Sequence, residues 1–262
     1  MTLADLSAVD WGLLLVAAAC VGFAKTAISG VAAISVVIFA AVLPARESTG
    51  ALLALLLCGD LMALRHYHRH ADWPALIRLL PAVLPGLALG AVFVAYADDR
   101  LMRVSIGVIL LVMTGLQLWS RRGKAEPSEE SAAPEEPDTA ASTARRRGAA
   151  AGAGLAAGFT TMTANTGGPV MTLYLVMSGL PMLRMLGTAA WFFFVVNVAK
   201  VPFSVGLGLI SWQSLAMDAL LIPAMIAGGL VGLAVIRRID QRQFERAALA
   251  LSGLGAALLL VP

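Results

Sequence analysis

Long stretches of apolar residues alternate with short polar segments along most of the chain. In the first half the apolar runs cover residues 9–24, 28–43, 48–64, 76–97 and 101–119, and in the second half they cover 149–160, 167–180, 187–207, 215–236 and 247–262. A helix needs about 20 residues to cross the hydrocarbon core of a bilayer. The third, fourth and fifth runs of each half are near that length. The pattern therefore predicts three full spans in each half, preceded by a pair of shorter segments.

The composition supports lipid as the solvent of these runs. Of the 262 residues, 59% are hydrophobic and 13% are charged, and the mean hydropathy is +0.84. About 25% of the residues of an ordinary soluble domain are charged. Lys and Arg lie in short clusters between apolar runs, which is typical of membrane proteins and argues against a surface that binds nucleic acid. We predict an all-α polytopic membrane protein.

The two halves of the chain resemble each other. Landmarks recur in the same order, with Gly22-Phe23, Pro44, Trp73, Pro81, Gly86, Gly90, Asp98 and Arg100 matching Gly158-Phe159, Pro181, Trp212, Pro223, Gly228, Gly232, Asp240 and Arg242. Internal repeats of this kind are common in secondary transporters. We assign residues 1–120 to an N-terminal membrane repeat and residues 149–262 to a C-terminal one.

A polar stretch separates the repeats. Residues 124–138 are rich in Glu, Pro, Ser and Ala, and arginines flank them on both sides. Such a composition buries too little apolar surface to fold. Residues 121–148 are therefore predicted to be a disordered cytoplasmic linker.

Loop charges predict that the repeats have opposite orientations. The segment 65–78 is rich in Arg and His, whereas its counterpart 207–214 is uncharged, and the excess of Arg moves to 237–246 in the second repeat. Positive charge marks the cytoplasmic side, so residues 65–75, the linker and 237–246 all face the cytoplasm only if the repeat is inverted. Inversion requires an odd number of crossings in each repeat. Either a re-entrant hairpin or two complete spans at the start of each repeat meets that condition, and the weakly apolar, Gly-rich 149–160 favours the hairpin.

Each short pair contains a polar, Gly-rich break, at 22–30 and at 158–169. Irregular backbone at membrane depth is tolerated only where it is buried in protein or lines a cavity, and paired breaks point to a transport site. The N-termini of half-helices offer N–H groups that suit an anion. Close helix packing is the alternative explanation for the small residues. The predicted binding residues of the breaks are Lys25, Thr26, Ser29, Gly30, Thr160, Thr161, Thr163, Asn165, Thr166, Gly167 and Gly168.

Polar and charged side chains inside apolar runs add further candidates. Asn197 and Lys200 are predicted to bind substrate, and Asp60 either neutralises a lysine or carries a coupling proton. Such residues are costly in lipid and often functional. The alternatives are that Lys200 extends to the outer interface and that Asp60 lies near the inner one. Asp218 stands at the start of its run and is expected at an interface.

Signatures of enzymes and metal sites are missing from the sequence. It contains no HExxH, GxSxG or P-loop motif, so we predict neither an enzyme nor a cofactor. His66 and His70 have the spacing of a metal pair on a helix, but a basic cytoplasmic loop explains them better.

The break motifs resemble a known family. Gly22-Phe-Ala-Lys-Thr-Ala-Ile-Ser-Gly30, its repeat ending in Asn165-Thr-Gly-Gly-Pro169, and Asn197-x-x-Lys200-x-Pro202 are similar to the sulfite exporter TauE/SafE family. The resemblance covers nearly the whole chain except the linker. It implies a bacterial plasma membrane protein with seven or eight membrane segments that moves small sulfur-containing or organic anions.

The hypothesis from the sequence is a secondary transporter that exports sulfite or an organosulfonate, with its site between the two breaks and H⁺ as a candidate coupling ion. An anion channel and a membrane subunit without transport activity are the alternatives. The sequence leaves open the substrate, the coupling ion, the direction and whether two copies form a homodimer.

Overall fold

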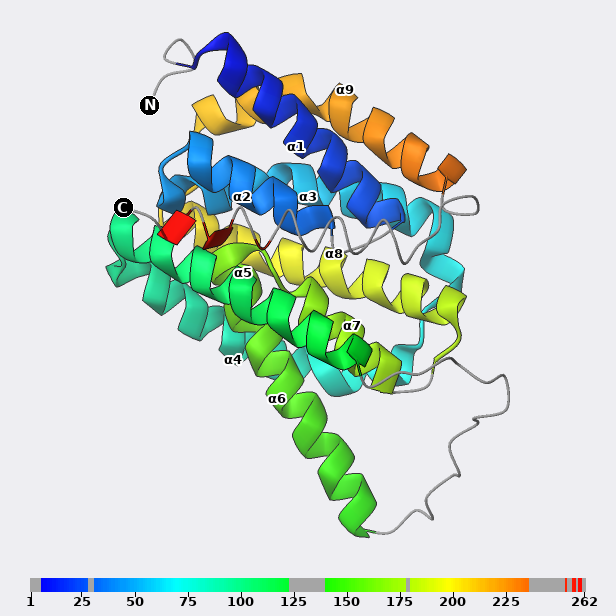
Figure 1. Cartoon of the computed structure of the whole chain (residues 1–262). Coiled ribbons are helices and arrows are strands. Elements are labelled where there is room, and N and C mark those ends of the chain that lie inside the picture. Colours follow the sequence, from blue (N-terminus) through cyan, green and yellow to red (C-terminus); the bar gives the residue numbers. More distant parts are fainter. Residues whose placement is uncertain are drawn as a thin grey trace.

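The computed structural model describes residues 6–27, 31–122, 140–177, 180–235 and, near the C-terminus, 253, 256, 257, 259 and 260, and within these residues it contains helices and no strand. The helices of the first repeat are α1 (Ala8–Thr26), α2 (Ala32–Val42), α3 (Ala45–Tyr67), the 3-10 turn η3 (His68–His70), α4 (Trp73–Tyr96) and α5 (Asp99–Arg122). Those of the second repeat are α6 (Ala140–Ala164), α7 (Gly168–Met177), α8 (Met182–Gly206) and α9 (Trp212–Val235), as Figure 1 shows.

Several helices are suited to a bilayer by length and by surface. The spans Ala8–Thr26, Ala45–His70, Trp73–Tyr96, Leu183–Gly206 and Trp212–Ala234 are long and apolar enough to cross a membrane. Large apolar side chains cover their outer faces, among them Val16, Ile77, Leu84, Val92, Leu220 and Leu230, each more than half exposed. An apolar surface of this extent fits contact with lipid tails. The prediction of an all-α polytopic membrane protein is confirmed.

Start signals of helices recur in the two repeats. α3 begins directly after Pro44 and α8 begins directly after Pro181, and both prolines have extended backbone. Proline has no N–H to lose at the start of a helix, so it is well tolerated there. α4 has its own cap, because the Asp72 carboxylate accepts a hydrogen bond of 2.9 Å from the Ala75 N–H.

The opening pair of each repeat differs from the prediction in one respect. Only its second member is short, since α2 has 11 residues and α7 has 10, whereas α1 has 19 and α6 has 25. α6 begins at Ala140, so its first turns lie inside the range predicted for the linker. Ala and Arg are strong helix formers, which explains why the helix continues through the Arg-rich segment. Residues 123–139 of the predicted linker lie outside the described residues.

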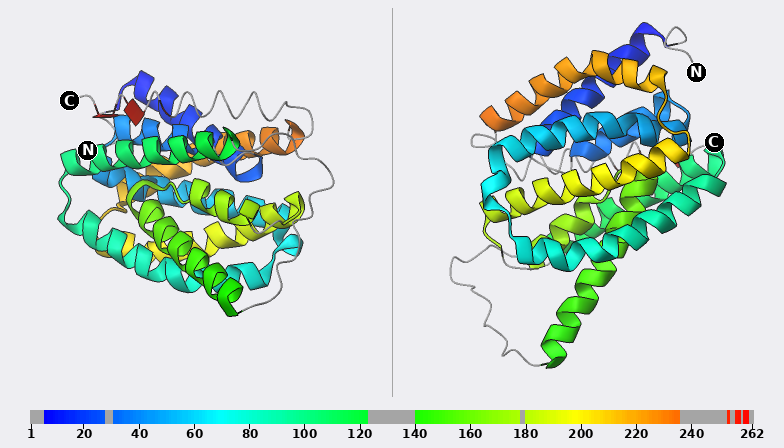
Figure 2. Two further views of the ribbon diagram at one scale, coloured as in Figure 1. Left: turned by 60° about the horizontal axis from the view of Figure 1, so that its bottom comes forward. Right: turned by 180° about the vertical axis from the view of Figure 1, so that it is seen from behind.

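Counterpart helices of the two repeats run in opposite directions. In Figure 1, α3 and α8 lie side by side, with α3 running from left to right and α8 from right to left, and α4 and α9 are reversed in the same way. The view from behind in Figure 2 shows the same arrangement. The helices therefore have the inverted arrangement that the loop charges predicted.

The two repeats are interlaced through glycines. Gly22 of α1 lies against α9, where an added Cβ atom would stand 2.7 Å from the Gly229 nitrogen. Gly158 of α6 lies against α4, where an added Cβ would stand 2.8 Å from the Leu87 nitrogen. Small residues allow membrane helices to approach this closely. The first helix of each repeat thus packs on the other repeat, and the two contacts are counterparts.

Replacing Gly158 by Ala should destabilise the protein by about 1–3 kcal/mol, because the new methyl group collides with the α4 backbone. Gly152→Ala, on the same helix, is the matched control, since no atom lies within 4 Å of its added Cβ. The measurement is thermal unfolding of both variants in detergent. Equal melting temperatures for the two variants would contradict the close crossing.

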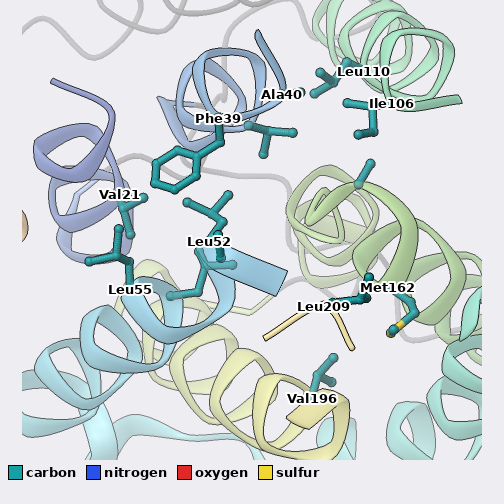
Figure 3. Close-up of a cluster of buried hydrophobic side chains, with 14 of the residues drawn as sticks. Val21, Phe39, Ala40, Leu52, Leu55, Ile106, Leu110, Met162, Val196 and Leu209 are labelled. Atoms are coloured by element: carbon teal, nitrogen blue, oxygen red, sulfur yellow. The ribbon is translucent and has the colours of Figure 1, made fainter. Parts of the chain in front are cut away.

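A continuous apolar core holds α3 against α8. Figure 3 shows part of it, with Phe39 from α2, Leu52 from α3, Ile106 from α5 and Val196 from α8, each at most 1% exposed. Ala256, from the last apolar run, belongs to the same core. The α3–α8 pair therefore lies at the centre of the molecule, where residues from both repeats surround it.

Each end of the α3–α8 pair is covered by a loop that packs on a glycine. At one end, an added Cβ on Gly187 of α8 would stand 2.7 Å from the His70 carbonyl carbon. At the other end, an added Cβ on Gly50 of α3 would stand 2.6 Å from the Leu209 carbonyl carbon. Both glycines stand six residues after the proline that precedes their helix, so they are counterparts. We name these the His70 end, which is the predicted cytoplasmic one, and the Leu209 end.

Polar contacts reinforce the His70 end. The Asp72 N–H donates to Thr188 Oγ1 at 2.9 Å, and the Trp191 indole N–H donates to the His68 carbonyl at 3.2 Å. Arg184 stands 3.9 Å from the Asp72 carboxylate. We name these contacts the His70 clasp, and they join the loop of the first repeat to α8 of the second.

The Leu209 end has a pocket. It lies between the start of α3 and the start of α9, and we name it the Leu209 pocket. Its lining includes Glu47, Ala51, Leu209, Gln213, Ser214 and Met217. The two ends of the α3–α8 pair are therefore unlike, one clasped by hydrogen bonds and the other hollowed.

Candidate functional site

A row of buried polar side chains crosses the α3–α8 pair, and its centre is a contact between repeat counterparts. The Asn197 side-chain amide donates a hydrogen bond of 2.6 Å to Asp60 Oδ2. The two side chains are 2% and 0% exposed. Each residue stands 16 positions after the proline before its helix, so they are counterparts. The bond therefore lies where the two repeats meet on their symmetry axis.

Lys25 extends the row on the α1 side. Its ammonium group stands 2.5 Å from Asp60 Oδ1 and 4.6 Å from the centre of the Phe193 ring. An aromatic face attracts a cation through its electron-rich centre. Lys25 lies in the last turn of α1, where the helix dipole also favours positive charge.

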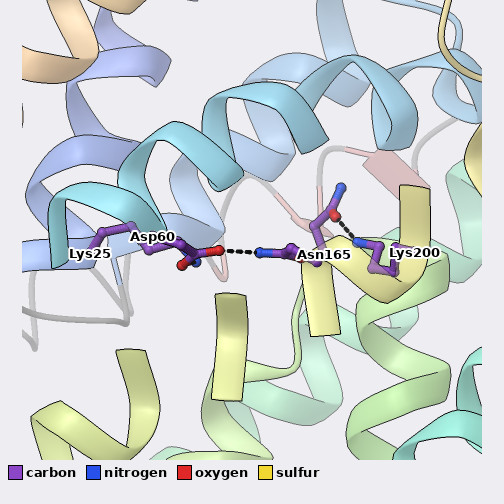
Figure 4. Close-up of polar contacts among 5 residues, drawn as sticks. Lys25, Asp60, Asn165 and Lys200 are labelled. Carbon is purple, nitrogen blue, oxygen red and sulfur yellow. Dashed lines mark hydrogen bonds and ion pairs between the residues drawn. The ribbon is translucent and has the colours of Figure 1, made fainter. Parts of the chain in front are cut away.

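Lys200 extends the row on the α6 side. Its ammonium group donates to the Thr161 carbonyl at 2.8 Å and to Asn165 Oδ1, and the side chain is 1% exposed. The Asn165 amide in turn donates to the Thr49 carbonyl at 3.0 Å. Asn165 has a φ of 51°, a left-handed conformation that Asn tolerates better than most residues, and it ends α6. Figure 4 shows the row from Lys25 to Lys200.

The row has more basic groups than acidic ones. Lys25 and Lys200 are its two basic residues, and Asp60 is its one acidic residue. Burying an ammonium group in a membrane protein is costly unless acceptors surround it. Here each ammonium has protein acceptors, a carboxylate for Lys25 and carbonyl oxygens for Lys200. An oxyanion that reached the row would compete with Asp60 for Lys25 and with Asn165 for Lys200.

A family model described as Sulfite exporter TauE/SafE matches residues 14–259. The chain belongs to this family. The match includes every residue of the buried row and confirms the resemblance that the break motifs indicated. Searches of curated proteins and of solved structures found no match. TauE/SafE proteins are membrane transporters of the sulfite-exporter type, so transport across a membrane is the function class of this member.

Some of the predicted site residues of this TauE/SafE member lie in the row, and others have side chains that bond to the backbone. Lys25, Asp60, Asn165, Asn197 and Lys200 form the row, and the Thr161 carbonyl closes it. The hydroxyls of Thr26, Thr160 and Thr166 instead donate to backbone carbonyls, of Gly229, Ala156 and Ala164 respectively.

The remaining predicted residues of the second break are placed as follows. Thr163 is fully buried, and its hydroxyl has no hydrogen-bond partner among the described residues. Gly167 packs on Thr161, and Gly168 begins α7. Ser29 and Gly30, in the first break, lie outside the described residues.

Two sequence interpretations are corrected. Lys200 does not extend to the interface, because its buried ammonium bonds to α6. Asp218 is not interfacial in its surroundings, since it is 3% exposed. α1 and α3 pack against α9 and account for that burial.

Sequence reasoning missed the pairing at the centre of the row. The equal distance of Asp60 and Asn197 from their prolines was a signal that could have found it, because counterparts on an axial helix pair face each other. Phe193 and Thr49 carry no such signal. A Phe among apolar residues and a Thr near a helix start are unremarkable until the helices are packed.

Proposed function

We propose that the protein is a secondary carrier that exports a small sulfur-containing anion, sulfite or an organosulfonate, across the plasma membrane of a bacterium, with the linker in the cytoplasm. The excess of basic groups in the buried row carries the proposal. Membership of the TauE/SafE family supports the class of cargo. The oxygens of a sulfonate or sulfite group can accept from the two ammonium groups, and one negative charge balances the row.

Binding is a competition in this proposal. The anion displaces the Asp60 carboxylate from Lys25 and takes the place of the Asn165 carbonyl oxygen on Lys200. The Asp60 carboxylate then keeps the Asn197 amide as its donor. Because Asp60 and Asn197 belong to different repeats, a change at this contact alters how α3 lies against α8. Movement between the repeats is the basis of alternating access in inverted-repeat transporters.

The two covered ends supply gates for this cycle. Release toward the His70 end requires the loop of the first repeat to leave Gly187 and the His70 clasp to break. Access from the Leu209 end requires the Leu209 loop to leave Gly50. The counterpart positions of the two glycines support a cycle in which either end opens while the other stays packed.

Counterflow in proteoliposomes tests the proposal. Vesicles loaded with unlabelled sulfite or sulfoacetate should take up the labelled anion transiently, with saturation, as a carrier does. Asn165→Ala and Thr163→Val should lower the uptake, and Gly152→Ala should leave it unchanged. Absence of exchange for any of these anions would refute the carrier, and single-channel currents would identify a channel.

Weakening the His70 clasp should shift the protein away from the conformation with a packed His70 end. Thr188→Val removes the acceptor of the Asp72 N–H, a bond of about 0.5–1.5 kcal/mol, so the balance should move by roughly 2- to 10-fold. The readout is labelling of Gln213→Cys in the Leu209 pocket by a membrane-impermeant thiol reagent, with Cys20 and Cys58 replaced by Ala. We expect slower labelling when the clasp is weakened, because the Leu209 end stays packed while the His70 end is open.

The control for the clasp is Arg103→Gln, which removes an exposed charge on α5. Its labelling rate should equal that of the parent. Unchanged labelling in Thr188→Val would show that the two ends open independently, and alternating access through these loops would then be wrong.

A further inference from the structure

Asp218 is a buried carboxyl group that takes no part in the row. It lies in the second turn of α9, and it is 3% exposed. Both of its carboxylate oxygens are buried without a hydrogen-bond partner among the residues that the structure describes. Asp60, in contrast, has an ammonium group and an amide donor. Asp60 and Asp218 therefore have opposite surroundings.

An ionised carboxylate does not suit the surroundings of Asp218. Moving an ionised carboxylate out of water is very unfavourable when no hydrogen-bond donor or cation compensates for the lost hydration. A neutral carboxylic acid avoids most of that cost. The packed arrangement around α9 thus fits an Asp218 that holds a proton, and release of the proton requires water or a donor to reach the carboxyl group.

Residues beside Asp218 in α9 line the Leu209 pocket. Met217, the neighbour of Asp218, and Ser214, one turn earlier, both line that pocket. The helices packed against α9 are α1 and α3, and the titratable groups of α3 include Arg46, Asp60, Arg65 and His66. α3 brings Glu47 into the pocket and Cys58 within electrostatic range of Asp218, and α1 carries Asp10, Cys20 and the Lys25 that is paired with Asp60. None of them donates a hydrogen bond to Asp218.

α9 also connects Asp218 mechanically to the row. α1 crosses α9 at Gly22, which faces Met225 and Gly229, and Lys25 follows Gly22 by one turn. A shift of α9 that hydrates Asp218 therefore moves the helix that holds Lys25 beside Asp60. The first repeat has no equivalent acid, because the landmark prolines place the buried Leu76 at the counterpart position.

We propose that Asp218 is the proton-binding residue that couples anion movement to proton movement, with one proton bound and released per anion. The proposal rests on the proposed transport function. The carboxyl group takes up a proton from water in the Leu209 pocket when that end opens, holds it while α9 is packed, and releases it to water at the His70 end when that end opens, so each cycle moves one proton across the membrane. Asp60, which is paired with Lys25 while the anion site is empty, serves the anion site.

The test uses proteoliposomes of the full chain with sulfite as the probe and an imposed pH gradient. One proton per anion supports an accumulation of about tenfold for one unit of pH. Asp218→Asn should abolish this accumulation and the accompanying change of internal pH while retaining counterflow, which needs no net proton transfer. Asp99→Asn, an exposed carboxylate on α5, should behave as the wild type. Proton-driven accumulation that persists in Asp218→Asn would overturn the proposal.

Infrared difference spectroscopy gives a readout that does not depend on transport. The wild-type protein in detergent should show the band of a protonated carboxyl group, and Asp218→Asn should lose it. Asp218→Glu retains an acid and should keep a shifted band, which serves if Asp218→Asn does not give folded protein. A band that is missing from the wild type, or that Asp60→Asn removes instead, would overturn the assignment. Absence of wild-type counterflow with this band present would refute the transport proposal and the coupling role that rests on it, but not the protonated state of Asp218.

Discussion

Asp60→Leu should destabilise the protein by about 3–5 kcal/mol, which is the usual effect of removing one partner of a buried ion pair. The change leaves the Lys25 ammonium against an apolar neighbour, and among the described residues the Phe193 ring is the contact that still attracts it. It also leaves the Asn197 amide without its acceptor. Thermal unfolding in detergent measures the loss, and the fraction of monodisperse protein after purification reports it independently.

Lys25→Met combined with Asp60→Leu should recover most of that stability without recovering transport. Apolar residues of similar volume replace a buried ion pair with little cost. Lys200 is then the one lysine left in the row, so the anion loses one of its two ammonium partners. A double variant as unstable as Asp60→Leu would show that the ion pair is not what the aspartate serves. A stable double variant with full counterflow would remove Lys25 and Asp60 from the anion site.

Lys200→Met should lower anion transport by about 10- to 100-fold, as expected for the loss of charge-assisted hydrogen bonds of roughly 1.5–3 kcal/mol. Methionine has a similar length and flexibility and fills the buried space, but it cannot donate. The measurement is the initial rate of labelled sulfite counterflow over a range of concentrations. Because the lysine acts on the anion, the half-saturating concentration should rise.

The control for Lys200→Met is Arg103→Gln, which removes a cation at the surface. Folded Lys200→Met protein with a wild-type rate would exclude Lys200 from the site. Lys200→Arg is a useful second variant. Arginine keeps the charge but presents a planar group in a space shaped for an ammonium, so partial activity is expected.

The membrane fold could be predicted from the sequence because a bilayer imposes strong constraints on which residues a spanning helix and its loops can contain. A spanning helix needs a long apolar run, and loop charges fix its direction, so the run pattern and the arginines around 65–78 and 237–246 indicated inverted repeats. The lengths of α1 and α6 were harder to predict from the sequence. Lys25 and the Arg-rich start of α6 lower the hydropathy of their segments, although both residue types continue a helix readily.

The site was predictable as a set of residues but not as a set of contacts. Lys25, Asp60, Asn197 and Lys200 stood out because polar side chains inside apolar runs are costly. Whether Lys25 meets Asp60, or Lys200 meets Asn165, depends on how far each helix is rotated about its axis. Asp218 shows the same limit, because its position near a helix start indicated an interface and only the packing of α1 and α3 encloses it.

The crossing of α1 with α9 has a consequence for biosynthesis. α1 leaves the ribosome early, yet the surface that receives Gly22 belongs to α9, which is made roughly 200 residues later. During that interval the glycine face of α1 has no native neighbour and must remain against lipid or an insertion factor. α6 has no such delay, because α4 is already in the bilayer when it arrives. The contact between α1 and α9 is therefore expected to form late in assembly, when α9 reaches the first helix.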